Sequence, residues 1–427
     1  MNSSATERTA TPPPDRKQRL RAKITRETAA EYAEAARSLR AHPDYNAVWD
    51  NFLAIIEQPQ SARQIERRTA RPVVEHLCNQ APLEIAHALG LQPLRLASGC
   101  CAASRLADAS LPALMCPLMR STLGMRALLA ADDESNAAAT LRIIPTTCDW
   151  TVKFPELAGE SDKTRAHFLE LPHLRHSERG QARFQEELFI LIEELEKTAA
   201  RRLTRAALRA SIDLYRQAWA VFAEFIALRR DGRLAAVWFM VVCAAFMADT
   251  VEHWLAAAAP ILAHLQKESR RVVGNAVFVF LSGSPLLFPN LKILRLIEEA
   301  GLYVLADDLC ASERLWPGGL TISDPSFSGL IRALAGRYHR ACQCPTFADN
   351  QRRFNTIRAS GLRPRGIIHH VLKGCHPFDI ESLTMEREAA KAGIPFIRIE
   401  TEYSPEDART LLTRLEAFAH IDQGAMK

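Results

Sequence analysis

Short apolar runs that end abruptly in glycine, serine or cysteine constrain the fold of this chain more than any other feature. The clearest lies in "RGIIHHVLKGCHPFD", where Ile367, Ile368 and Val371 are typical of a strand covered on both faces. Gly374 ends this strand, and Cys375 follows at once. Because ligands of open α/β sheets collect beyond the carboxyl ends of the strands, Cys375 occupies a position where such a fold does chemistry.

Similar runs alternate with helical patterns in both halves of the chain. "LRIIPTTCD" lies in the first half, and "AVFVFLSGSPL" and "YVLADDLC" lie in the second. Such alternation predicts parallel sheets, and the long apolar periodicity between them predicts a separate helical segment. We therefore expect an α/β protein in which an N-terminal helix and a first α/β domain (27–180), a helical segment (181–268) and a second α/β domain (269–427) follow one another.

The N-terminal 26 residues are expected to form a disordered tail, because "MNSSATERTATPPPDRKQRLRAK" is polar, proline-rich and without the apolar core of a signal peptide. Residues 27–58 read as helix up to the break at Pro59. A second stretch, "LAAVWFMVVCAAFMA" at residues 234–248, is uncharged but shorter than the roughly twenty residues that cross a bilayer. It predicts a buried core helix, and no membrane partner is expected.

Charge and cysteine usage limit the class of protein. The 54 basic residues nearly match the 49 acidic ones, so nothing indicates a nucleic-acid surface. Ten cysteines without an export signal indicate a reducing, cytoplasmic location, where thiols fill cores, bind metals or act as nucleophiles. The absence of any CxxC weakens zinc ribbons, ferredoxin-type clusters and thioredoxin-like motifs.

Three cysteines share a favourable context. Cys148 in "IPTTCD" and Cys375 in "LKGCHP" follow predicted strands, whereas Cys116 in "LMCPLMR" precedes a predicted helix. Backbone amides at such positions help to stabilise a thiolate. Three thiolates from two domains could hold an iron–sulfur cluster with one iron left open, and the alternative is that each is a buried structural thiol.

Polar side chains at two other predicted strand ends are candidates for substrate binding. "LSGSPLLF" could cradle a phosphate, and the tip in "LADDLCASERLW" is either a polar binding tip or a hydrogen-bonded strand end. The candidates are Ser282, Ser284, Asp307, Asp308 and Arg314.

Three further cysteines are less easily assigned. Cys342 and Cys344 in "HRACQCPTF" are too close together for a standard zinc site, so a core or loop role is favoured, and Cys310 is the next candidate ligand after the three above. The chain has no Walker loop, GxGxxG, HExxH or GxSxG motif. We therefore expect that it binds neither ATP nor a dinucleotide by those routes.

Five segments in order resemble one family: "CPLMRSTLG", "IIPTTCDW", "FLELPHLRHSE", "VLADDLCASERLW" and "LKGCHPFDIESLTMEREAAKAGIPFIRIETEYSPEDARTLLTRLEAF". They are similar to the 2-hydroxyacyl-CoA dehydratase and benzoyl-CoA reductase subunits, of the 2-hydroxyglutaryl-CoA dehydratase D-component type, over residues 82–418. The resemblance implies two flavodoxin-like domains and a 4Fe-4S cluster held by Cys116, Cys148 and Cys375. It also implies a related second subunit or self-association, and a separate iron–sulfur activator that hydrolyses ATP, which agrees with the missing ATP motif.

The resemblance also implies a reaction. One electron placed on a CoA thioester would give a ketyl radical that expels a hydroxyl group, so the chain is expected to be a subunit of a radical 2-hydroxyacyl-CoA dehydratase acting on an acyl-CoA. The alternatives are a benzoyl-CoA reductase subunit, a non-catalytic electron-relay subunit, and a homodimeric double-cubane reductase acting on small molecules.

Overall fold

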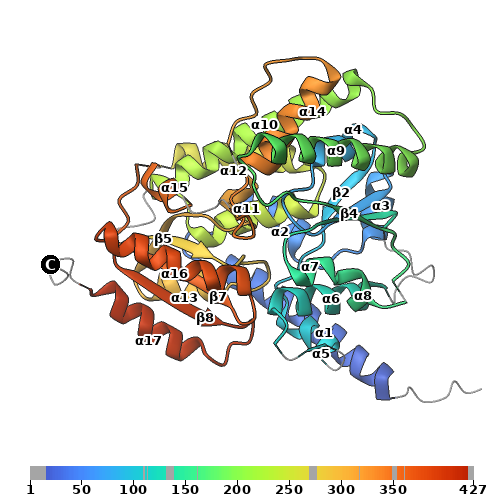
Figure 1. Ribbon diagram of the computed structural model, residues 1–427. Helices are drawn as coiled ribbons and strands as arrows, with labels where there is room; N and C mark the ends of the chain where they lie inside the picture. Colours follow the sequence, from blue (N-terminus) through green and yellow to red (C-terminus); the bar gives the residue numbers. More distant parts are fainter. Residues whose placement is uncertain are drawn as a thin grey trace, which may run out of the picture.

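The computed structural model describes residues 16–108, 111–112, 114–130, 139–160, 162–268, 277–316, 318–348, 353–359 and 361–421. Figure 1 shows two sheets side by side, with the helices α9 (Glu178–Ala199), α10 (Arg205–Arg230) and α14 (Phe327–Ala335) gathered at one end of the molecule. The α/β class with two parallel sheets is as the sequence predicts.

The first sheet contains four parallel strands in the order β2-β1-β3-β4. Their bounds are β1 (Val73–His76), β2 (Gln92–Arg95), β3 (Leu141–Pro145) and β4 (Ala166–Leu169). The helices that precede or connect these strands in sequence are α2 (Asp50–Ile56), α3 (Ala62–Thr69), α4 (Leu83–Ala88), α5 (Cys101–Asp108), α6 (Pro117–Ala130), α7 (Asp149–Val152) and α8 (Phe154–Ala158), after a short 3₁₀ turn η1 (Ala47–Trp49).

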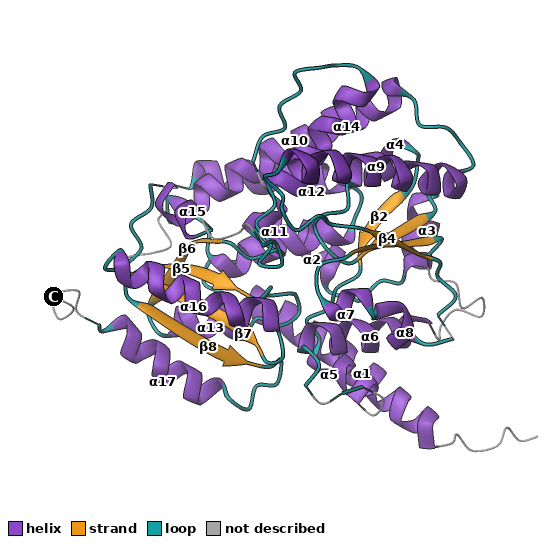
Figure 2. Ribbon diagram, viewed as in Figure 1, coloured by secondary structure: helices purple, strands orange, loops and turns teal. Residues whose placement is uncertain are grey.

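The second sheet repeats this arrangement, with the order β6-β5-β7-β8 and all pairs parallel (Figure 2). Its strands are β5 (Val277–Gly283), β6 (Leu302–Asp307), β7 (Gly366–Leu372) and β8 (Phe396–Thr401). The other elements that connect or follow these strands in sequence are α13 (Lys292–Glu299), η2 (Glu313–Leu315), η3 (Gly336–Arg340), α15 (Phe354–Ala359), α16 (His376–Lys391) and α17 (Ala408–Ala419). In each sheet the strand that comes first in sequence lies between the second and the third, as in flavodoxin-like folds.

Four helices connect the sheets in sequence: α9, α10, α11 (Ala236–Ala248) and α12 (Val251–Lys267). The hydroxyl groups of Ser177, Thr204 and Thr250 cap α9, α10 and α12 by accepting a backbone N–H bond. Figure 1 shows that α14, which follows β6 in sequence, packs beside α9 and α10. The predicted boundary at residue 268 borders residues 269–276, which lie outside the described residues.

The apolar stretch around Trp238 is a core helix, as predicted. Eleven of the thirteen residues of α11 are buried, among them Trp238, which stacks on Trp49 with ring centroids 4.6 Å apart. No helix in the described part of the chain has the length and apolarity needed to cross a bilayer. Burial all round explains why α11 carries no polar face.

The N-terminal prediction was partly wrong. Helix α1 (Arg16–Arg40) already begins at Arg16, so residues 16–26 are helical instead of disordered, whereas residues 1–15 lie outside the described residues. The predicted helix at 27–58 is interrupted between α1 and η1. Apolar anchors that recur at helical spacing extend α1, because Ile24 is only 2 % exposed and Tyr32 and Leu39 are also buried.

Candidate functional site

Seven of the ten cysteines line one small cavity of about 110 Å³. The first sheet and its loops contribute some of them, and the second sheet and its loops contribute the others: Cys78, Cys116, Cys148, Cys310, Cys342, Cys344 and Cys375. Several follow the carboxyl ends of strands β1, β3, β6 and β7. In parallel α/β folds this edge is where ligands bind, so the cavity is the candidate site.

The three predicted ligands lie together at helix starts. Cys116 immediately precedes α6, and Cys148 and Cys375 occupy the N-cap positions of α7 and α16. Cys116 and Cys375 belong to one apolar contact group, and a hydrogen bond between their side chains, together with burial, raises the pKa of the Cys375 thiol. Burial also raises the pKa of Cys148. Both thiols are therefore protonated at neutral pH in the protein alone, and a metal would have to displace these protons.

Gly374 explains how Cys375 reaches Cys116. Its φ is +72°, and a Cβ at this position would lie 2.1 Å from the backbone oxygen of Leu114. Only glycine combines this left-handed conformation with so close an approach of two backbones. The glycine of the "LKGCHP" segment therefore holds together two loops that are far apart in sequence.

Four more cysteines complete the wall: the sequence analysis named Cys310 as the next candidate ligand, but it did not predict Cys78, Cys342 and Cys344 here. Cys78 follows β1, and its Sγ lies 3.3 Å from the hydroxyl of Thr147, the residue before Cys148. Gln80 donates to Cys342 Sγ over 3.2 Å. Burial raises the pKa of Cys78, and it raises that of Cys342 to about 11.

The Cys342–Cys344 segment combines two roles. Both cysteines pack against the apolar core around α9 and α10, as a core role requires, and both also line the cavity. Burial raises the pKa of Cys344 as well, and its Sγ accepts a hydrogen bond of 3.2 Å from Thr346. The thiols that the sequence assigned to packing thus face the same space as the three predicted ligands.

Two arginines bring positive charge to this cavity. Arg95, the last residue of β2, is 8 % exposed; its Nη1 donates to Cys310 O over 2.9 Å, and its Nη2 lies 3.5 Å from Cys310 Sγ. Arg314 in η2 donates through Nη1 to Gln343 O and lies over the ring of Phe378, 5.4 Å from its centroid. Arg314 is one of the five predicted substrate-binding residues, and it is the one among them that lines the cavity.

The other four predicted substrate residues are engaged inside the protein. Ser282 donates to Asp308 over 3.3 Å, and Ser284 accepts from the backbone N–H of Leu372 over 3.0 Å. Asp307 and Asp308 are less than a tenth exposed, and each forms a buried ion pair with an arginine. This arrangement matches the hydrogen-bonded strand end that the sequence left open, and a role in substrate binding stays a prediction.

The thiols are not arranged as a ready-made metal site. Among the described residues, no group of three or more His, Cys, Asp or Glu side chains is placed to hold a single metal ion. The donor set nevertheless fits iron–sulfur chemistry, because thiolate is the ligand that such clusters prefer and the nearby guanidinium groups favour negative charge. The residues that would hold a cluster are therefore the cysteines of this cavity.

Comparison with known proteins identifies the family of this chain. The family model of the 2-hydroxyglutaryl-CoA dehydratase D-component matches residues 78–421. The putative dehydratase subunit YjiM of Escherichia coli K12 is 26% identical over 86% of this chain and 98% of its own length. The (R)-phenyllactyl-CoA dehydratase beta subunit of Clostridium sporogenes is 21% identical over 87% of this chain and 97% of its own.

A third relative comes from the reductase side of the family. This benzoyl-CoA reductase subunit of Thauera aromatica is 22% identical over 78% of this chain and 86% of its own length. The range that the family model matches begins at Cys78 and includes all seven cysteines of the cavity. The chain belongs to the family of the 2-hydroxyglutaryl-CoA dehydratase D-component, as its five sequence segments predict.

Proposed function

We propose that this chain is an iron–sulfur subunit that accepts low-potential electrons from a separate, ATP-hydrolysing activator. The observation that carries the proposal is the convergence of seven cysteines on one cavity at the carboxyl ends of both sheets. Cys116, Cys148 and Cys375 would hold a 4Fe-4S cluster. When bound, such a cluster supplies one-electron chemistry that amino-acid side chains lack. The chain's own contribution is to bury the site, supply thiolates and exclude water.

Four further thiols favour a cluster larger than a single 4Fe-4S cubane. Three cysteines are enough for one four-iron cluster with an open iron, whereas Cys78, Cys310, Cys342 and Cys344 line the same space. The volume of about 110 Å³ is also small beside the roughly 300–1,000 Å³ of a typical ligand pocket. Among the functions that the sequence leaves open, the double-cubane reductase acting on small molecules is the one that this geometry supports best.

The second candidate is the radical 2-hydroxyacyl-CoA dehydratase, with benzoyl-CoA reduction as its variant. Family membership and the names of two relatives favour an acyl-CoA substrate. Both relatives are named as subunits of their enzymes, which supports a related second subunit as partner. An electron-relay subunit, whose partner binds the substrate, belongs to the same candidate.

Iron and sulfide analysis after anaerobic purification distinguishes the candidates. For a larger cluster we expect more iron than the four atoms of one cubane per chain. We expect Cys116→Ala, Cys148→Ala and Cys375→Ala to lose most of it. Cys78→Ala and Cys342→Ala should lose part of it. Cys243→Ala, which changes a fully buried thiol in α11 outside the cavity, is the matched control.

Other results of the iron analysis would favour the second candidate or contradict the ligand assignment. Four irons per chain that survive Cys78→Ala and Cys342→Ala would favour the dehydratase, and full retention in the Cys116, Cys148 and Cys375 variants would contradict the ligand assignment. Substrate is then tested under anoxia with the co-purifying subunit, an ATP-hydrolysing activator and a strong reductant. Water loss from 2-hydroxyacyl-CoAs would select the dehydratase, ring reduction of benzoyl-CoA would select the reductase variant, and turnover without ATP would contradict the activator.

A further inference from the structure

Arg95, which is buried, and Arg314, which is half-buried, differ from the buried Arg142 and Arg229 in forming no ion pair with a carboxylate among the described residues. Neither guanidinium forms an ion pair with Asp or Glu within the described residues; their contacts are backbone oxygens, Asn79, sulfur atoms and an aromatic ring. The Nε of Arg95, and both Nε and Nη2 of Arg314, are buried without any hydrogen-bond partner. These N–H groups are thus available to a group that enters the cavity.

Two buried arginines elsewhere in the molecule are neutralised by carboxylates. Arg142 pairs with Glu75 at 2.7 Å and with Asp162 at 2.8 Å. Arg229 pairs with Asp307 at 2.6 Å. Removing a guanidinium charge from water costs several kcal/mol unless an anion compensates it. Two guanidinium groups without an ion-pair partner beside seven thiols therefore indicate that this cavity is built for a group of net negative charge.

We propose that Arg95 and Arg314 are the counter-ions of the anionic cluster held by the thiols, and that they set its reduction potential. The inference rests on the proposed function. Cysteine thiolates and sulfides give a cluster net negative charge, and one more electron makes that charge larger. A nearby fixed positive charge stabilises the reduced form more than the oxidised form, so it raises the potential. Arg95 contacts a ligand candidate directly, because its Nη2 lies 3.5 Å from Cys310 Sγ.

The experiment compares removal of charge with its conservation. Arg95→Gln and Arg314→Gln remove the charge but keep a polar side chain, whereas Arg95→Lys and Arg314→Lys keep the charge. Arg40→Gln is the control, because Arg40 is exposed, pairs with Asp50 and Glu57, and lies outside the cavity. Each full-length protein is purified anaerobically, checked by circular dichroism, assayed for iron and sulfide, and titrated by electron paramagnetic resonance.

We expect both glutamine variants to be harder to reduce by about tenfold in the one-electron equilibrium, which is a fall of about 59 mV in midpoint potential. The lysine variants should recover most of this shift, and Arg40→Gln should not change the potential. Iron lost from the glutamine variants but retained in the lysine variants would also support the inference, because it shows that the charge is needed to hold the cluster.

Three results would overturn it. Unchanged potential and unchanged iron content in both glutamine variants would contradict the counter-ion role alone. Equal loss of iron from the glutamine and lysine variants would show that packing, and not charge, is required. Absence of iron from the unaltered protein would contradict the proposed function itself, and the inference with it.

Discussion

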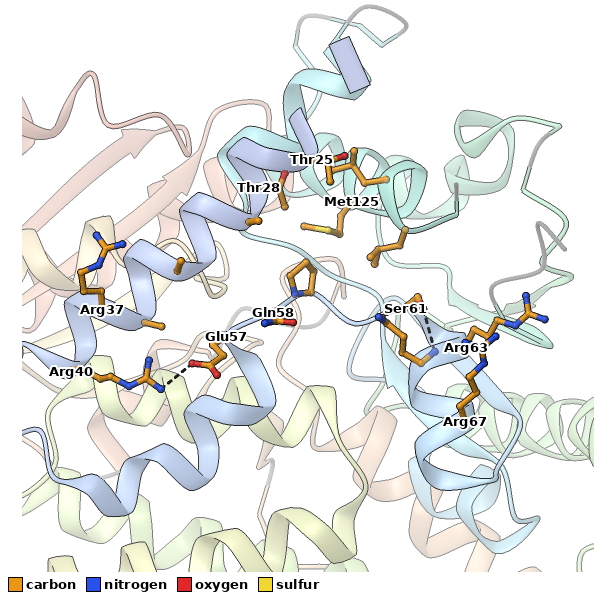
Figure 3. Close-up of a pocket in the computed structure, with 17 residues that line it drawn as sticks. Thr25, Thr28, Arg37, Arg40, Glu57, Gln58, Ser61, Arg63, Arg67 and Met125 are labelled. Carbon is orange, nitrogen blue, oxygen red and sulfur yellow. Dashed lines mark hydrogen bonds and ion pairs between the residues drawn. The ribbon is translucent and has the colours of Figure 1, made fainter. Parts of the chain in front are cut away.

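The thiol cavity and a much larger surface groove both contain arginines, but these differ in their access to water and to carboxylate partners. The groove has a volume of about 990 Å³ and is lined by α1, α3, α6 and the segment around Gln58 (Figure 3). Its arginines are Arg37, Arg40, Arg63 and Arg67. Figure 3 shows Arg40 directed at Glu57, with which it forms a hydrogen bond of 2.9 Å, whereas Arg95 and Arg314 face the far smaller thiol cavity without a carboxylate.

This difference shows that size does not identify the functional site. Arginines at the groove are reached by water and by acidic neighbours, so their charge costs little and requires no ligand. Burial in the thiol cavity removes both sources of compensation and raises the pKa of the surrounding thiols. The arginines of the thiol cavity therefore still need an anionic partner, whereas those of the groove do not.

The largest effect is expected where a buried ion pair beside the cavity is broken. Arg353 is 3 % exposed and pairs with Asp308 at 2.6 Å and with Glu381. Arg353→Met leaves the buried Asp308 and the half-buried Glu381 unpaired and should lower the free energy of unfolding by about 4 kcal/mol. Arg40→Gln in the groove should cost about 1 kcal/mol or less. Urea unfolding measures both, and equal losses would contradict the contrast between the two regions.

A second effect concerns pH and the strand that ends at Cys375. His370 in β7 is fully buried, and burial lowers its pKa from 6.5 to about 4. Its Nδ1 lies 3.1 Å from Ser284 O, which can only accept, so Nδ1 carries the proton.

Between pH 6.5 and pH 4 this histidine is protonated in the unfolded chain but neutral in the folded chain. Stability is therefore present above pH 6.5 and is lost as the pH falls towards 4, by up to about 3 kcal/mol for this residue. His370→Gln should flatten the pH dependence of the unfolding free energy by that amount. His420→Gln, at an exposed position near the C-terminus, is the control, and an equal slope in both variants would contradict the prediction.

The sequence predicts the site best where a cysteine follows a strand with a clear apolar pattern. The seven residues of β7 are all buried, and those of β3 are too, so the run of apolar residues before Cys375 and Cys148 identifies both positions. Cys78 was missed because β1 has four residues and two of them are Glu75 and His76. Glu75 is buried against Arg142 from the neighbouring strand, and this pairing across the sheet is not visible in the local sequence. The remaining signal was a thiol four residues after a pair of valines.

Asp307 and Asp308 illustrate an ambiguity that the local sequence leaves open. Their polarity at a strand end is typical of a binding tip, but their partners are Arg229 in α10 and Arg353 before α15. Because these partners are distant in sequence, local patterns cannot tell a satisfied carboxylate from one that awaits a ligand. The same limit applies to Arg314, whose lack of a carboxylate is apparent only from the three-dimensional arrangement.

The smallest effect is expected at the groove itself. Ser61 caps α3 by accepting from Gln64 N over 3.2 Å, and the Gln64 side chain accepts from Ser61 N over 2.7 Å. Ser61→Ala removes one half of this capping box and should lower the free energy of unfolding by about 1 kcal/mol. Arg67→Gln, on the exposed face of the same helix, should change it by less than about 0.5 kcal/mol.

Iron content is a second measurement for the Ser61→Ala variant, beside its free energy of unfolding. Ser61 borders the groove but not the thiol cavity, so Ser61→Ala should keep the iron and sulfide of the unaltered protein while its stability falls. A loss of iron in this variant would mean that the groove and the cavity are coupled through α3. The groove and the thiol cavity could then not be treated as two independent regions, one exposed to water and the other buried.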